Sequence, residues 1–236
     1  MKRLVRPATI AAFCLVAMFS LLLLMPLGTA ASAVGLSARH SQGTILSGAL
    51  RDVHAGSLRL GDINAKLKIL PLFMGRLAFA VHRGDAPHAP GVSGTIGSGW
   101  GGGFADTLTA TIAADNLLEG VEGSEVRLEA LSFAFVNRRC ASASGVVRLS
   151  LDDTALGSVI RGGLMGNARC SNGDLLLPLL SASAMEKATI RIKADGRYEA
   201  ILTVNEPSPD IAAALGLAGF RPVAGGYRVV RKGTIG

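Results

Sequence analysis

The sequence has few of the residues from which catalytic and metal sites are usually built. Its 236 residues include four histidines, all within the first 88, three cysteines and one tryptophan. It lacks a GxSxG nucleophile motif, a CxxC pair and a glycine-rich loop that ends in Lys-Ser or Lys-Thr. These absences argue against a serine-hydrolase elbow, a cysteine metal site and a Walker phosphate loop, respectively. We therefore expect no enzyme activity, no bound metal and no cofactor.

The nearest approach to a catalytic pair is His54 with Asp52. A solvated turn explains these two residues more readily than a catalytic triad, which also needs a placed nucleophile. An exported hydrolase stays open as a hypothesis, and it would require Asp and Ser side chains to gather with His54 around one pocket.

Charged residues are also scarce, at 17% of the chain. The 24 Lys and Arg against 17 Asp and Glu give a net charge of +7. Lys2, Arg3 and Arg6 supply three of these charges, so the remainder carries 7 − 3 = +4. The remaining bases are scattered singly rather than clustered with aromatic residues, so we do not expect nucleic acid as a partner.

A long apolar run near the N-terminus is the most distinctive feature of the sequence. Lys2, Arg3 and Arg6 precede the uncharged residues 7–27, which number 27 − 7 + 1 = 21. This is close to the ~20 residues that span a bilayer and longer than the ~7–15 of a signal-peptide core. We predict that residues 1–33 form a single-pass anchor of the bacterial inner membrane with a cytoplasmic N-terminus. The alternative is a signal peptide cleaved after Ala33, where Ala-Ser-Ala forms an Ala-x-Ala site.

Cysteine usage agrees with export. Cys14 lies inside the apolar run, and Cys140 and Cys170 are the two cysteines beyond it. In an oxidising compartment such as the periplasm these two can pair and close a loop of 170 − 140 = 30 residues. We predict this disulfide; the alternative is two unpaired buried thiols.

Residues 34–236 alternate between apolar and polar side chains in many short segments. Leu67 with Ile69, and Val126 with Leu128 and Ala130, are examples. Such period-2 patterns, separated by Gly, Asn or Asp, indicate half-buried strands joined by hairpins. We therefore predict a mainly β periplasmic domain over 34–236: an elongated, curved antiparallel meander of about ten or more strands.

Two segments favour short helices. The stronger is 208–219, with Ser208 as N-cap and with Leu215 and Leu217 expected against the sheet. The weaker is 152–167, in which three glycines lower helix stability.

Residues 84–103 are linker-like, with two prolines and eight glycines. Their composition permits a hinge between two parts of the sheet. Trp100 lies in this stretch, where an exposed Trp could contact a partner or the membrane interface. The alternative is that Trp100 packs over the edge of its own sheet.

Three segments carry a resemblance to a known family. They are "GTILSGAL" at 43–50, "LRLGDINAKLKILPLFMGRLAFAV" at 58–81 and "DIAAALGLAGFRPVAGGYRVVRKGTIG" at 210–236. In this order, after an N-terminal anchor, they resemble the type II secretion system protein N family. The resemblance implies an accessory component of the machine that exports folded proteins across the outer membrane, with its bulk in the periplasm. It also implies partners among the other subunits, on the inner-membrane platform or the secretin side, and no catalytic residues.

A second function remains open beside the secretion role. A long curved sheet with an apolar inner face could hold acyl chains, as in a periplasmic lipid-handling protein. A continuous dry apolar groove would favour that function, and an interior filled by its own side chains would count against it. On the leading hypothesis no small-molecule substrate is expected.

Overall fold

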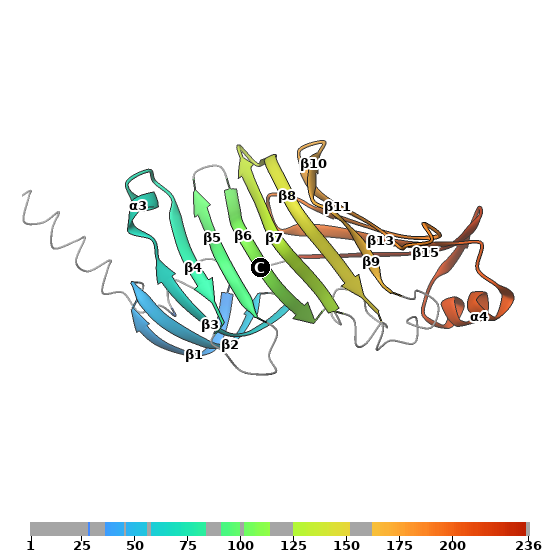
Figure 1. The fold of residues 1–236 in the computed structure, drawn as a ribbon, viewed down its shortest axis with the longest axis horizontal. Coiled ribbons are helices and arrows are strands. Elements are labelled where there is room, and N and C mark those ends of the chain that lie inside the picture. Colours follow the sequence, from blue (N-terminus) through green and yellow to red (C-terminus); the bar gives the residue numbers. More distant parts are fainter. Residues whose placement is uncertain are drawn as a thin grey trace, which may run out of the picture.

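The chain forms one long antiparallel β-sheet in the computed structural model (Figure 1). The structure describes residues 28, 36–44, 46–55, 58–83, 91–99, 102–113, 125–151 and 162–234. The fifteen strands within these ranges all belong to this sheet, and two short helices lie outside it. The prediction of a mainly β, antiparallel fold is therefore confirmed.

The strands follow one another closely along the chain. They are β1 (Leu36–Thr44), β2 (Ser47–Ala55), β3 (Leu58–Leu67), β4 (Leu77–His82), β5 (Val92–Gly99), β6 (Gly102–Ala113), β7 (Glu125–Val136), β8 (Arg139–Ser150), β9 (Leu164–Asn167), β10 (Arg169–Ser171), β11 (Asp174–Leu180), β12 (Glu186–Ile192), β13 (Arg197–Asn205), β14 (Arg221–Val223) and β15 (Gly226–Thr234). The helices are α3 (Ile69–Leu72) and α4 (Pro209–Leu217).

The order of strands in the sheet is almost the order of the sequence. From β1 to β9 each strand pairs with the next, and the path continues through β11, β12, β13, β15 and β14, with β10 paired to β11. In Figure 1 the strands β11, β13 and β15 pass behind β7, β8 and β9. The sheet thus turns back over itself, and its apolar inner faces form the core.

Bulges keep the apolar side chains on the inner face along the longest strands. In β7 the buried residues are Val126 and Leu128 before the bulge and Leu131 and Phe135 after it. The alternation changes parity at Ala130, which is exposed and has φ of 49°. The prediction that Ala130 continues the inward alternation is therefore wrong, because a bulge inserts an extra residue at this point.

The bulges of β6 and β7 stabilise each other. The bulged Ala130 donates its backbone N–H to Oγ1 of Thr109 at 3.2 Å, and the bulged Thr107 donates its own to Oγ of Ser132 at 2.9 Å. Gly145 of β8 faces the β7 bulge, where a Cβ would lie 2.6 Å from Cα of Leu131. Bulges increase local twist and bend a strand, so this row of bulges contributes to the curvature of the sheet.

Helix α4 was predicted and α3 was not. Leu215 of α4 is fully buried as expected, but Leu217 is 93% exposed, which corrects its predicted position against the sheet. Ser208 has the extended backbone of an N-cap but makes no side-chain capping bond. Ile69 was expected to extend a strand, and it instead begins α3 with half of its side chain exposed.

Several predicted features lie outside the described residues. Apart from Gly28, these include the whole predicted N-terminal segment 1–33. Among the described residues, no helix is long and apolar enough to cross a membrane. Of the linker-like stretch 84–103, residues 91–99 contain β5, which pairs with β4 and β6. The weaker predicted helix is described only from residue 162, and residues 164–167 form β9.

Candidate functional site

An apolar cavity of about 400 Å³ lies where the sheet turns back over itself. One wall comes from β6, β7 and β8, and the opposite wall comes from β11, β12 and β13; we call these the first wall and the second wall. Ligand pockets commonly have volumes of about 300–1,000 Å³, so the cavity is large enough for a small apolar ligand.

The lining is almost entirely hydrocarbon. It comprises Leu108, Ile112, Val126, Leu128, Leu131, Phe133, Phe135 and Leu149 of the first wall, Leu175, Leu177, Ala188, Ile190, Ile192, Tyr198, Ala200, Ile201 and Leu202 of the second wall, and Gly103, Lys193, Ala194 and Gly196. Most of these residues alternate along their strands, because alternate residues of a strand point to the same face; Ile201, between Ala200 and Leu202, is an exception. The parity change at the β7 bulge allows both halves of that strand to line the cavity.

Charge is confined to one end of the cavity, at the turn between β12 and β13. Lys193 is exposed there. Asp195 accepts hydrogen bonds from the side chain of Arg197 at 2.7 Å and from its backbone N–H at 3.1 Å. These two bonds hold the pKa of Asp195 below its usual range. Because the Asp195–Arg197 pair is neutral, Lys193 leaves this turn with a net positive charge.

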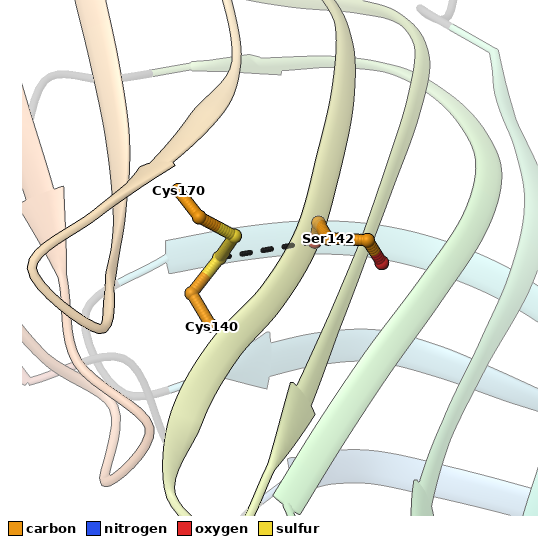
Figure 2. The surroundings of a disulfide bond; sticks show 3 residues. All are labelled: Cys140, Ser142 and Cys170. Carbon is orange, nitrogen blue, oxygen red and sulfur yellow. Dashed lines mark hydrogen bonds between the residues drawn. A yellow bond between two sulfur atoms is a disulfide. The ribbon is translucent and has the colours of Figure 1, made fainter.

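The predicted disulfide is present and joins β8 of the first wall to β10, which pairs with β11 of the second wall. Cys140 at the start of β8 is bonded to Cys170 in β10, with a Cα–Cα distance of 5.5 Å (Figure 2). Phe135 and Leu175, which stand opposite these cysteines in the neighbouring strands, both line the cavity. The backbone N–H of Cys140 also donates to the carbonyl of Gly173 at 2.7 Å. Leu175 is opposite Ile192, the residue before Lys193, so the bridge lies near the same end of the cavity as Lys193.

Figure 2 also marks a contact beside the bridge. Sγ of Cys140 lies 3.8 Å from the carbonyl oxygen of Ser142. A sulfur in a disulfide carries no proton to donate, so this contact is a close approach of sulfur to oxygen and not a hydrogen bond.

The other residues considered from the sequence do not join this site. Trp100 lies outside the described residues, although its neighbours Gly99 and Gly102 pair at the end of the β5–β6 hairpin. Asp52 lies in a bulge of β2, 3.8 Å from Arg39, and the side chain of His54 is outside the described residues. No group of three or more metal-binding side chains occurs in the part of the chain that the structure describes.

The cavity itself was not predicted as a site. Val126 and Leu128, which line it, are predicted from their alternation to face inward from a sheet. Their alternation predicts burial, but it does not distinguish a filled core from an open one, because that depends on how far the sheet curls.

The chemistry available in the cavity is that of apolar binding. Its walls offer dispersion contacts and exclusion of water, and Lys193 at one end offers a cation to an anionic group. Among the lining residues only Tyr198 and Lys193 carry polar side-chain groups, a phenolic hydroxyl and an ammonium.

Comparison with protein families finds one family model that matches most of the chain. Residues 34–231 match the family model described as type II secretion system (T2SS), protein N. The match spans 231 − 34 + 1 = 198 residues and ends three residues before the end of β15. Neither a search of curated proteins nor a search of solved structures returned a match. On this match over most of its length, the chain belongs to the type II secretion system protein N family.

Proposed function

We propose that the protein is an accessory component of the type II secretion system that acts by contacting other subunits and not by catalysis. The observation that carries this proposal is the family match over residues 34–231, which ties the chain to type II secretion. The site chemistry is compatible with this role, since the cavity walls are almost entirely apolar.

The proposed location is the inner membrane, with the sheet in the periplasm. Three bases followed by 21 uncharged residues support an N-terminal anchor. The Cys140–Cys170 disulfide is compatible with this location, since such bonds persist in the periplasm and are rare in the cytosol.

The edge strand β1, which Gly28 approaches at Ser41, is our proposed contact surface for another subunit. Among the described residues, β1 pairs only with β2. An unpaired edge presents backbone N–H and C=O groups that can bind an added strand. Gln42 is exposed on this edge strand, nine residues beyond the predicted cleavage position at Ala33.

Site-specific crosslinking in intact cells tests this role. A photoreactive residue at Gln42 is expected to capture a secretion-system subunit, whereas one at Arg127, exposed on the central strand β7, is not. Deletion of the gene is expected to reduce secretion of folded substrates. The proposal fails if no secretion subunit is captured from either position and secretion is unchanged by the deletion.

A second candidate function, lipid handling, is favoured specifically by the cavity. Its hydrocarbon walls and the single cation at one end suit one acyl chain of an anionic amphiphile, with the head group near Lys193. Part of the core is filled by its own side chains, such as Leu179 and Leu151, so the ligand would occupy the cavity and not the whole interior.

Binding of a fluorescent fatty acid to the full chain tests the second candidate. Ala188 is 4% exposed and lines the cavity, so Ala188→Phe is expected to abolish saturable binding. Lys193→Ala is expected to weaken binding of the fatty acid but not of the alcohol with the same chain. Lys187→Ala, which removes an exposed base of β12 outside the lining, is the control. Unchanged binding by Ala188→Phe would reject the cavity as a lipid site and leave the secretion role untouched.

A further inference from the structure

The connection between β3 and β4 exposes a cluster of large apolar side chains at one end of the sheet. Leu70, Phe73 and Met74 are 76%, 82% and 65% exposed, and Ile69 and Leu77 beside them are about half exposed. No residue of α3 is buried. We call Ile69–Leu77 the apolar tip. Such side chains are usually buried, and an exposed apolar cluster on a folded protein commonly marks a binding surface.

Part of the backbone of the apolar tip is hydrogen-bonded within the tip. The N–H groups of Met74 and Arg76 both donate to the carbonyl of Pro71 at 3.0 Å, and Gly75 donates to Leu72 at 2.9 Å. At the base, Lys68 donates its N–H to the carbonyl of Ala78 at 2.8 Å. These N–H groups can therefore leave water without losing a partner, which is a requirement for backbone that enters a membrane.

Basic residues surround the apolar tip and acidic residues are absent from this part of the chain. Lys66, Lys68 and Arg76 are exposed. The sequence contains no Asp or Glu from residue 63 to residue 84. The ammonium of Lys68 donates to the neutral hydroxyl of Thr95 at 2.7 Å.

The neighbouring strands add one acid near these bases, Asp106 of β6, which is opposite Thr95. Ser47, at the start of β2, is opposite Lys66, and Ser98, near the end of β5, is opposite Leu77. The described part of the β5–β6 hairpin next to Ser98 is glycine-rich, with Gly99 opposite Gly102. The apolar tip and its surroundings therefore combine apolar side chains with net positive charge.

We propose that the apolar tip inserts into the interface of a membrane that contains anionic phospholipids, with its bases in contact with the head groups. Lys and Arg can keep their charged ends at head-group level while their stems lie along apolar surface, and anionic lipids attract bases close to the bilayer. A specific protein interface usually takes about 800 Å² from each partner, contributed by about 20–30 residues. A few side chains at the end of one hairpin suit shallow insertion better than such an interface. The proposal does not depend on the cavity or on the proposed secretion contacts.

Fluorescence of a label on the apolar tip tests the insertion. The full chain carries Cys14→Ser, so that a single Met74→Cys provides the free thiol, because Cys140 and Cys170 are bonded to each other. The labelled protein is reconstituted into phosphatidylcholine vesicles with and without phosphatidylglycerol, and nitroxide groups on the lipid chains act as quenchers. We expect strong quenching in the vesicles that contain phosphatidylglycerol and weak quenching in phosphatidylcholine alone.

Matched variants separate insertion from general proximity to the bilayer. A label at Leu217→Cys, 93% exposed on α4 and without a base in the last turn of that helix, is the control and is expected to remain unquenched. Lys66→Gln and Arg76→Gln are expected to lower the ratio of inserted to free tip by about fivefold for each base removed. Leu70→Ser with Phe73→Ser is expected to abolish quenching without loss of folding, since both side chains are exposed.

Three outcomes would overturn the proposal. Equal quenching at positions 74 and 217 would mean that proximity alone is measured. No quenching at position 74 in either lipid mixture would exclude insertion. A change in the fluorescence of the label that occurs with native membranes, which contain proteins, but not with pure lipid vesicles would assign the apolar tip to a protein partner.

Discussion

Removal of the disulfide offers a quantitative test of how the two walls are held together. Cys140 and Cys170 are separated by 30 residues, and the bridge restricts the unfolded chain by closing that loop. For a loop of this length the chain-entropy relation gives about 3–4 kcal/mol of stability. The double variant Cys140→Ala/Cys170→Ala is therefore expected to lose about 3–4 kcal/mol of its free energy of unfolding, a large share of the ~5–15 kcal/mol typical of a folded protein.

Urea denaturation of the full chain, followed by circular dichroism, measures this loss. The oxidised wild type is compared with the double variant and with the wild type in reductant. The reduced wild type should match the variant, and reductant should not change the variant. A loss below about 1 kcal/mol would refute the reasoning, because the loop would then not restrict the unfolded state as assumed. A large loss in the variant with no effect of reductant on the wild type would show that the substitutions damage packing.

Three further predictions concern single side chains. Leu215→Ala should cost about 2–5 kcal/mol in urea denaturation because the side chain is fully buried, whereas Leu217→Ala should stay within about 0.5 kcal/mol; equal losses would contradict the orientation of α4. A hydrogen bond from Lys232 holds the pKa of Glu199 below its usual range, so the stability from this pair is present at neutral pH and is lost as the pH falls below about 4.3. Glu199→Gln should remove that acid-dependent part, less than about 1 kcal/mol for so exposed a pair, and an unchanged pH profile of the urea midpoint would reject it. Thr109→Val should cost about 1 kcal/mol, because it removes the acceptor of the bulged N–H in β7, and it should speed hydrogen exchange at that amide; unchanged exchange would contradict the role of Thr109.

Alternation in the sequence was enough to predict the sheet but not all of its strands. The long strands carry several apolar residues at period 2, and these were recognised. Strands β9, β10 and β14 have only three or four residues, too few for any period to be visible. Helix α3 was missed because Ile69 continues the alternation of Leu67 and so mimics a strand. Ala130 was misplaced because a bulge is defined by pairing with the neighbouring strand, and that pairing cannot be read from one segment.

The disulfide could be predicted from the sequence, whereas the cavity could not. Cys140 with Cys170 could be predicted by counting, since they are the only two cysteines beyond the apolar run. The cavity depends on the distance between strands that are far apart in the sequence, and that distance is set by twist, bulges and curl summed over many strands. The exposure of Leu70, Phe73 and Met74 was likewise hidden, because a run of apolar residues normally predicts burial.

The nearly sequential strand order has a consequence for how the protein is made. In the path through the sheet, each strand pairs with one that lies at most two strands away along the chain, so most pairing is local in sequence. Local pairing favours rapid folding, and the strands can join the sheet in the order in which they are synthesised. Contact across the cavity is the exception, since it needs β11–β13 to reach β6–β8. A chain whose synthesis stopped before Cys170 would hold its first nine strands together while the apolar face of β6–β8 stayed open to water, a state prone to aggregation.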